Sequence, residues 1–257
     1  MPTEIVGLVP AAGLGSRLEP IPCSKELFPV GFATHPVYGK PHPKVVSQYL
    51  LEHMQRAGAG KAYFVLRKGK WDIPNYFGDG TQLGMHLAYL IMGRPYGTPF
   101  SLDQAYPFIQ GKQVVFGFPD ILFEPKNAFE QLLKRQQETE ADVVLGLYKV
   151  PSPHKWDMVK TDDGGRVEHI VRKPLCTDLT YGWAIACWGA RFTQFMHAHL
   201  EQIQEQVQER GQEVSVGEVI QEGIHNGLSV QSVCFDDSSC LDIGTPEDLR
   251  QAIKTLS

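Results

Sequence analysis

The sequence predicts a three-layer α/β/α protein in which helices cover both faces of a mostly parallel sheet. A short apolar run at 5–10 ends in small residues, as strands buried on both faces do. Strand-like runs then alternate with amphipathic segments, which is typical of parallel sheets. The chain has 257 residues, of which 42% are hydrophobic and 21% charged, so it can bury a large core and is too apolar for disorder.

Along the first half of the chain, the expected strands and helices alternate. The first strand, at 5–10, leads into a loop at 11–29 that is rich in Gly, Pro and Ser. A helix follows at 43–57, where apolar side chains recur at helical spacing, and Gly58 is expected to end it. The other elements expected in this half are a helix at 127–140 and strands at 61–67, 113–117 and 141–150.

The second half has a different pattern and is expected to be a smaller mixed β region. Short strands separated by tight turns are expected at 157–161, 166–171 and 181–188. The Gln- and Glu-rich segment at 202–212 predicts a solvated helix, and a last helix is expected near Pro246. No linker-like run separates the halves, so we expect a single domain over 1–257, with one part at about 1–150 and a second at about 151–257.

Charge and cysteine content exclude several classes of protein. There are 24 Lys and Arg against 29 Asp and Glu, a net charge of -5, so no basic field favours nucleic acid. No apolar run approaches the ~20 residues that span a bilayer. The cysteines contain no C-x-x-C pair and indicate a reducing, cytoplasmic location; they are Cys23, Cys176, Cys187, Cys234 and Cys240.

A glycine-rich turn directly follows the first strand and is the first candidate site. It runs Ala11-Ala12-Gly13-Leu14-Gly15-Ser16-Arg17-Leu18, and Lys25 follows eight residues after Arg17. Glycines at this place let backbone N–H groups approach a polyphosphate, and the two cations neutralise it. A G-x-G turn alone is as often an ordinary tight turn, so the cations carry the inference. Neither a Walker A loop nor a complete G-x-G-x-x-G is present.

With these residues the sequence resembles the sugar-1-phosphate nucleotidylyltransferase family, in particular the glucose-1-phosphate thymidylyl- and uridylyltransferases. The family signature G-x-G-[ST]-R-L, followed by K-x-L-x-P, matches residues 13–18 and 25–29. Further matching motifs follow in family order over nearly the whole chain. They are Gly39-Lys40-Pro41, the segments at 78–84 and 102–105, Arg172-Lys173-Pro174 and the segment at 241–246.

The resemblance implies a Rossmann-like fold and an enzyme that forms a nucleotide sugar. An oxygen of a sugar-1-phosphate would attack the α-phosphorus of a nucleoside triphosphate, dTTP or UTP, and pyrophosphate would leave. Mg²⁺ would be the cofactor, because it binds carboxylates together with phosphate oxygens. Its implied ligands are Asp120, in G-F-P-D after a strand, and Asp242, in C-L-D-I-G-T-P. Without the resemblance, an Asp at such a position is more often a turn or cap residue.

The resemblance also assigns roles to individual residues. Arg17 and Lys25 would be catalytic residues that hold the triphosphate. Lys173 and Gly182 would bind the sugar phosphate, although a surface ion pair is the alternative for Lys173. The residues implied for nucleotide binding are Ala11, Ala12, Gly13, Gly15, Ser16 and Gly97.

Departures from the family cluster where the base and the sugar would be bound. The base-contacting run Gln-Pro-x-x-x-Gly of the thymidylyltransferases is Met92-Gly93-Arg94-Pro95-Tyr96-Gly97 here. On the sugar side, Trp156-Asp157 stands where the family has a Tyr-Gly pair, Arg172 where it has a Glu, and Cys240 where it has a Trp. The identity of the base and of the sugar is therefore left open, as are the pathway and whether the chain forms a homo-oligomer.

Two other functions compete with this one. These departures allow a nucleotide-sugar-binding or regulatory protein on the same fold that performs no catalysis. A glycosyltransferase would need a D-x-D motif, but Phe118-Pro119-Asp120 holds one carboxylate. His197 and His199 are two residues apart, which does not suit zinc, and no G-x-S-x-G elbow indicates a hydrolase. Because the sequence ends at Ser257, a short catalytic form without a C-terminal extension is expected.

Overall fold

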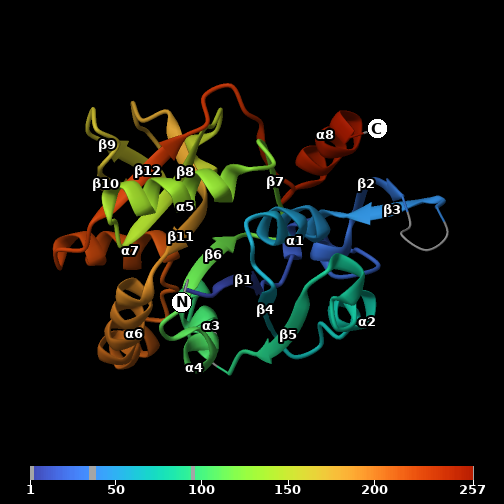
Figure 1. Ribbon diagram of the computed structural model, residues 1–257, viewed down its shortest axis with the longest axis horizontal. Coiled ribbons are helices and arrows are strands. Elements are labelled where there is room, and N and C mark those ends of the chain that lie inside the picture. Colours follow the sequence, from blue (N-terminus) through green and yellow to red (C-terminus); the bar gives the residue numbers. More distant parts are fainter. Residues whose placement is uncertain (1–2, 35–38, 94–95, 257) are drawn as a thin grey trace.

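The structure, a computed structural model, describes residues 3–34, 39–93 and 96–256. Its strands are β1 (Ile5–Ala11), β2 (Pro29–Thr34), β3 (Pro41–Val45), β4 (Lys61–Leu66), β5 (His86–Ile91), β6 (Gln113–Gly117), β7 (Ile121–Phe123), β8 (Val143–Lys149), β9 (Met158–Thr161), β10 (Val167–Val171), β11 (Tyr181–Trp188), β12 (Val230–Cys234) and β13 (Cys240–Asp242). Its helices are α1 (Val46–Arg56), α2 (Asp72–Phe77), α3 (Thr98–Leu102), α4 (Tyr106–Ile109), α5 (Ala128–Thr139), α6 (Ala190–Arg210), α7 (Val216–His225) and α8 (Pro246–Leu256) (Figure 1).

Strand β1 lies inside the parallel part of the large sheet, as its apolar sequence predicts. It pairs in parallel with β4 on one side and with β6 on the other, and β5 pairs in parallel with β4. Gly7 of β1 makes room for α1, because a Cβ there would lie 2.7 Å from Met54 Sδ. The carboxyl ends of β1, β4 and β6 therefore face the same edge, where open α/β sheets bind their ligands.

The second half of the chain extends this sheet with antiparallel strands. Strand β11 pairs antiparallel with β6 and with β8, and β9 and β10 form an antiparallel pair beside it. Strand β12 pairs in parallel with β8. The large sheet thus contains strands from both before and after residue 150.

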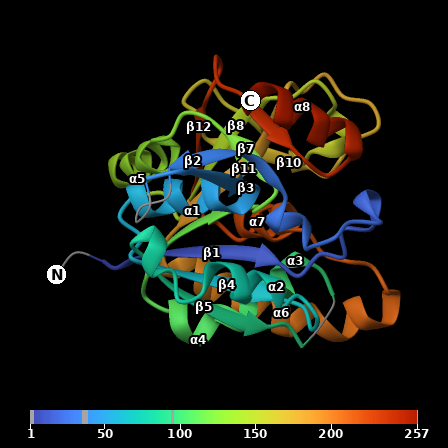
Figure 2. The same ribbon diagram turned by 90° about the vertical axis from the view of Figure 1, so that its right-hand side faces the viewer.

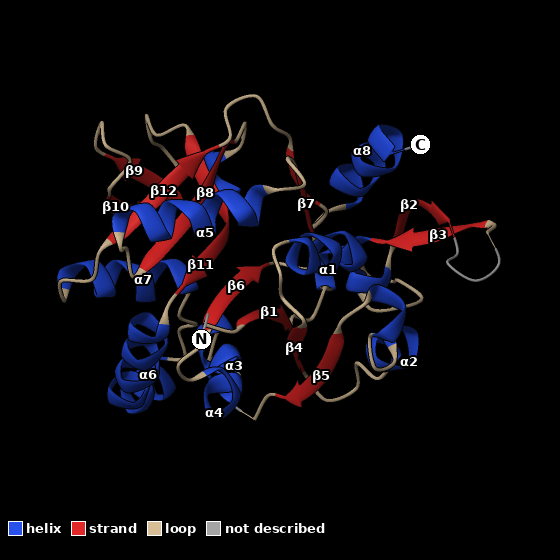
Figure 3. Ribbon diagram, viewed as in Figure 1, coloured by secondary structure: helices blue, strands red, loops and turns tan. Residues whose placement is uncertain are grey.

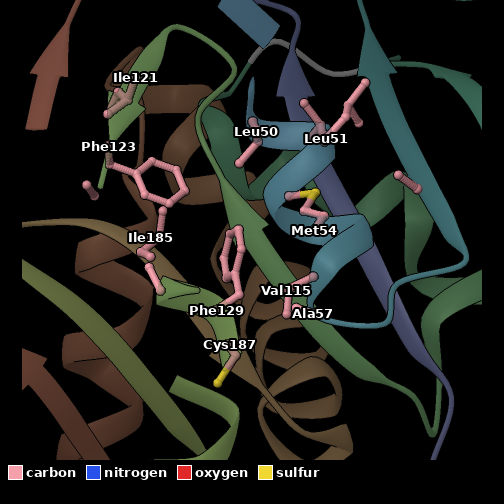
Figure 4. Packing of buried hydrophobic residues seen from close by; sticks show 14 of the residues in the cluster. Leu50, Leu51, Met54, Ala57, Val115, Ile121, Phe123, Phe129, Ile185 and Cys187 are labelled. Carbon is pink, nitrogen blue, oxygen red and sulfur yellow. The ribbon is translucent and has the colours of Figure 1, made fainter. Parts of the chain in front are cut away.

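Helices cover both faces of the large sheet, which makes three layers. Figure 2 shows α1 and α5 above β1, and α4 and α6 below it. On one face Leu50 of α1 and Phe129 of α5 pack in one core with Val115 of β6 (Figure 4). On the other face, Phe100 of α3 and Phe192 of α6 pack against the opposite side chains of the same strands. This arrangement confirms the predicted fold class.

Two segments differ from the sequence-based prediction. The helix expected from residue 43 begins at Val46, because Pro41–Val45 forms β3, which pairs with β2. The polar segment at 202–212 falls largely in the last part of α6, whose first turns bury Phe192 and Met196 against the sheet. None of the helices in the described residues has both the length and the apolar character that a membrane span requires.

A titratable group lies in the core at His53 of α1. Its side chain is buried, contacts the edge of Phe123 and, within the described residues, has no partner for Nδ1. Burial lowers the pKa of His53 from 6.5 to about 4. The unfolded chain therefore binds a proton more readily than the folded protein between these two pH values.

We predict that this proton uptake destabilises the protein at acidic pH. The contribution of neutral His53 is complete above pH 6.5 and is lost as the pH falls toward 4. Between pH 7 and pH 4.5, the parent should lose roughly 2 kcal/mol more unfolding free energy than His53→Leu, measured by urea denaturation. Equal losses in both proteins would contradict this assignment.

Candidate active site

The glycine-rich turn forms one wall of a cavity of about 790 Å³, called the larger cavity below. The turn leaves the carboxyl end of β1, and Leu18 anchors it in the core. Gly15 adopts a left-handed conformation with φ of 75°, which glycine tolerates best. A Cβ at Gly15 would lie 3.8 Å from Cδ of Lys25, so the turn and the lysine lie side by side.

The two predicted metal ligands lie next to each other on paired strands. Asp120 directly precedes β7, and β13, which ends at Asp242, pairs with β7 so that Asp242 lies opposite Ile121. The backbone N–H of Ile243 donates to the carbonyl of Asp120 at 3.0 Å. Figure 3 shows β7 apart from the large sheet. A separate two-stranded pairing thus joins two carboxylates that are more than a hundred residues apart.

Both predicted catalytic cations reach this pair of carboxylates. Lys25 Nζ forms an ion pair with Asp120, whose side chain is buried. A Cβ on Gly244 would lie 2.9 Å from Nη2 of Arg17 and 3.0 Å from Oδ1 of Asp242. The glycine at 244 therefore leaves space in which the Arg17 guanidinium approaches Asp242.

The electrostatics show an excess of negative charge between the carboxylates. Burial and the neighbouring Asp120 raise the pKa of Asp242 to about 6, although Lys25 and Arg17 oppose this. Burial alone would lower the pKa of Lys25, but Asp120, Glu26 and Asp242 outweigh it and raise the pKa. A divalent cation would supply the missing positive charge, and two carboxylates are oxygen ligands that suit Mg²⁺.

The two carboxylates would suit a cation that is shared with a ligand. Among the described residues, no group of three or more His, Cys, Asp or Glu side chains is placed to hold a metal ion. Two carboxylates therefore leave most coordination positions to other oxygens. Mg²⁺ commonly binds in this way, through one or two carboxylates, several waters and phosphate oxygens.

A buried ion pair holds the segment that presents Lys25. Lys70 Nζ lies 2.7 and 2.8 Å from the two carboxylate oxygens of Glu26, and both side chains are buried. Burial raises the pKa of Glu26 and lowers that of Lys70, while their mutual attraction opposes both shifts. Ser47 Oγ also donates to the carbonyl of Glu26 at 2.6 Å. The sequence analysis missed this pair, because no local pattern links residues 44 positions apart.

A second cavity of about 230 Å³, called the smaller cavity below, adjoins the first. Both cavities are lined by Phe118 and Asp120, so they meet at the carboxylate pair. The aromatic side chains of Trp156 and Trp183 form part of the wall of the smaller cavity. Lys173 also lines it and has a φ of 38°, a strained conformation for a residue with a side chain and one that is often found at functional sites.

The structure brings ten of the twelve sequence-predicted site residues to these two cavities. Ala12, Gly13, Gly15, Ser16, Arg17, Lys25 and Gly97 line the larger one, Lys173 and Asp242 line the smaller one, and Asp120 lines both. Ala11 and Gly182 line neither. The side chain of Ala11 points into the core. Gly182 packs against Trp156, and a Cβ on Gly182 would lie 2.9 Å from the Cβ of Trp156.

The segment expected to contact the base closes the larger cavity. Gly97, with φ of 111°, forms a bridge to Val214, and a Cβ there would lie 2.2 Å from the carbonyl oxygen of Val214. Only glycine fits this approach. Met92 and Gly93 also line the cavity, whereas Arg94 and Pro95 lie outside the described residues.

Arg67 and Lys68 are cations of the larger cavity that the sequence analysis did not single out. They directly follow β4, the parallel neighbour of β1. A basic pair at the carboxyl end of a parallel strand is a signal that could have found them, because these strand ends meet at the ligand-binding edge.

Comparison with known proteins identifies sequences that are related to this chain. The family model described as "Nucleotidyl transferase" matches residues 6–257. The low-salt glycan biosynthesis nucleotidyltransferase Agl11 of Haloferax volcanii is 26% identical over 255 residues, which are 96% of this chain and 64% of that protein. The glucose-1-phosphate thymidylyltransferase of Actinoplanes sp. is 29% identical over 172 residues, 66% of this chain and 52% of its own length. The chain thus spans less than two thirds of either relative.

Solved structures share the fold at low sequence identity. A putative glucose-1-phosphate thymidylyltransferase from Bacillus anthracis has a TM-score of 0.82 and 16% identity, with 98% of this chain and 95% of that chain covered. A UDP-glucose pyrophosphorylase from Acinetobacter baumannii has a TM-score of 0.77 and 17% identity, with 97% and 92% covered. These likenesses confirm the α/β fold with its mostly parallel sheet.

We predict that removal of one partner of the buried ion pair destabilises the protein. Lys70→Met leaves the Glu26 carboxylate buried without its cation, which should lower the unfolding free energy by about 3 kcal/mol in urea denaturation. Lys68→Met is the matched control, because Lys68 is exposed and two positions away. Similar effects of the two substitutions would show that the pair does not hold this segment.

Proposed function

Because the chain belongs to the nucleotidyl transferase family, whose model matches residues 6–257, we propose that it transfers a nucleotidyl group from a nucleoside triphosphate to a sugar-1-phosphate. The family match confirms the resemblance that the motifs indicated. The products would be a nucleotide sugar and pyrophosphate. The Haloferax relative is named for glycan biosynthesis and the Actinoplanes relative for thymidylyl transfer, which supports this reaction class.

The observation that carries the proposal is the junction of two cavities at a pair of carboxylates. The larger cavity, lined by Gly15, Arg17 and Lys25, would hold the triphosphate. The smaller cavity, lined by Lys173, would hold the sugar-1-phosphate. Asp120 lines both, so the two phosphates would meet where it lies. This geometry suits a reaction between two anionic substrates better than the binding of one ligand.

The chain's own residues would act by orientation and by neutralising charge. A phosphate oxygen of the sugar-1-phosphate forms a bond to the α-phosphorus, and the bond from this phosphorus to the bridging oxygen of pyrophosphate breaks. The attack brings two anions together, so cations fixed in place stabilise the transition state. Lys25 is held by Asp120 and by the segment that Glu26 and Lys70 anchor. Arg17, which lines the same cavity, would also contact the triphosphate.

We propose Mg²⁺ as the cofactor, with Asp120 and Asp242 as its protein ligands. The raised pKa of Asp242 and the oxygen-only donor set both fit a divalent cation. When bound, such an ion neutralises charge on phosphate oxygens and helps to align them. The triphosphate is proposed to be dTTP or UTP, from the resemblance to thymidylyl- and uridylyltransferases. The cysteines are free, and we propose a cytoplasmic location on this ground.

Pyrophosphate release tests the function. With Mg²⁺ and a panel of nucleoside triphosphates and sugar-1-phosphates, the protein should release pyrophosphate with at least one pair. Asp120→Asn and Asp242→Asn should lower kcat/KM more than about 100-fold, because each removes a charge at the reacting phosphates. Asp163→Asn, in an exposed turn, is the matched control and should keep full activity.

One result would favour the competing function. If no pair gives pyrophosphate, while a nucleotide or nucleotide sugar still raises the melting temperature, the chain is a binding protein on this fold. Equal activity of Asp120→Asn and the parent would instead remove the carboxylate pair from the mechanism.

The role of Lys173 predicts a selective defect. Lys173→Met should raise the KM for the sugar-1-phosphate about 10-fold or more, because one charged hydrogen bond to phosphate is lost, and should leave the KM for the triphosphate unchanged. Lys126→Met, at an exposed lysine outside both cavities, serves as the control. A larger change in the KM for the triphosphate than in the KM for the sugar-1-phosphate would contradict the assignment of Lys173 to the sugar-phosphate site.

A further inference from the structure

Two side chains in the wall of the smaller cavity each carry a buried polar atom without a partner. Within the described residues, Oδ1 of Asp157 and Nε1 of Trp183 are buried and make no hydrogen bond. Both side chains line this cavity. Buried polar atoms in folded proteins normally have partners, and each one without a partner costs free energy. One atom is an acceptor and the other a donor, so together they present a complementary pair of hydrogen-bonding groups.

Strand pairing places these two side chains next to each other. Asp157 immediately precedes β9, and Met158 of β9 pairs with Gly182 of β11. The backbone N–H of Trp183 donates to the carbonyl of Asp157 at 3.3 Å. Residues opposite each other on antiparallel strands project from the same face of the sheet. The acceptor and the donor therefore belong to neighbouring side chains of the cavity wall.

The other carboxylate oxygen of Asp157, Oδ2, lies against the first turn of α7. A Cβ on Gly217 would lie 2.6 Å from Oδ2, so the glycine leaves room for this oxygen beside the helix. The backbone N–H groups of a first helical turn favour a negatively charged acceptor there. With Oδ2 directed to α7, Oδ1 is the oxygen left for a ligand.

Two of the other charged side chains of the cavity wall are already paired. Arg172 lies 3.0 Å from Glu218, and Lys155 lies 3.0 Å from Asp248. Another part of the wall is aromatic: Phe118 and Trp183 have ring centroids 5.7 Å apart, and Trp156 is buried beside the same cavity. Flat apolar faces beside a few fixed polar groups are what orients a small ligand in a pocket.

We propose that Asp157 and Trp183 together bind one hydroxyl group of the sugar and thereby determine which sugar-1-phosphate is accepted. The hydroxyl donates to Oδ1 of Asp157 and accepts from Nε1 of Trp183. A single hydroxyl satisfies both atoms, whereas an ammonium group only donates and an ether oxygen only accepts. The side chains of the cavity wall adjust around the bound sugar, as is common on binding. This inference rests on the proposed function.

The substrate is therefore a phosphate ester of a sugar that keeps a free hydroxyl at the position facing these residues. A sugar that is deoxygenated or aminated at that position, or blocked there by an ether or ester, leaves at least one of the two atoms unpaired. A site built to bind a hydroxyl discriminates strongly against the analogue that lacks it.

The test compares the preferred sugar-1-phosphate with its monodeoxy analogues, one ring position at a time. With the parent protein, one analogue should lose about 10- to 100-fold in kcat/KM. Asp157→Asn keeps an acceptor toward α7 and turns the cavity-facing atom into a donor, and Trp183→Phe keeps the ring but removes the N–H. Both variants should lower kcat/KM for the natural sugar and reduce the penalty of that one analogue to less than about 3-fold, while the KM for the triphosphate stays unchanged.

Controls and a second readout keep the outcomes distinct. Asp178→Asn and Trp71→Phe, at positions that do not line this cavity, should keep the full penalty. Turnover with no such penalty in the parent, or with the same penalty in both variants, overturns the inference and leaves the proposed function standing. If no turnover occurs, calorimetric binding of the same sugar phosphates decides. If one deoxy analogue binds more weakly to the parent and both variants remove this difference, the inference is supported although the proposed function fails. If no analogue binds more weakly to the parent, both the inference and the proposed function are overturned.

Discussion

Two carboxylates held side by side in a buried place are the constraint on which the rest of the site depends. Like charges repel more strongly where water is excluded, so Asp120 and Asp242 stay together only because their strands pair and cations surround them. Arg17 and Lys25 offset part of the repulsion, while burial together with the Asp120 charge still raises the pKa of Asp242. Such an arrangement fits the proposed binding of a cation together with phosphate oxygens.

The sheet topology explains why two cavities meet at this pair. The parallel half brings the carboxyl ends of β1 and β4 to one edge, where the glycine-rich turn begins. Strand β11 then runs antiparallel beside β6 and carries the second half of the chain to the same edge. The Gly97–Val214 bridge connects the two halves above it. One continuous sheet thus fixes the distance between the two binding sites, which a reaction between two bound substrates requires.

Much of the fold was predictable because its signals are local. A continuous apolar run identified β1, strand-like runs identified β4 and β6, and helical spacing identified α1, while the motifs identified the turn, both lysines and both aspartates. The N-terminus of α7 also carried a local signal, the capping box of Ser215 and Glu218, which the sequence analysis did not use. By contrast, β3 contains Pro41 and Pro43, which suggest a loop, and only its pairing with β2 makes it a strand.

The sequence by itself determined the family, the alternation of the main strands and helices, and the residues that we propose bind phosphate and metal. Only the tertiary structure decided which of these residues meet. It separated Ala11 and Gly182 from the cavities, because one points into the core and the other supports Trp156. It also paired Glu26 with Lys70 and set Asp157 beside Trp183. The physical reason is that hydrogen bonds, ion pairs and repulsion act over a few ångströms in space, whereas the residues that feel them are separated along the chain by distances that no local pattern encodes.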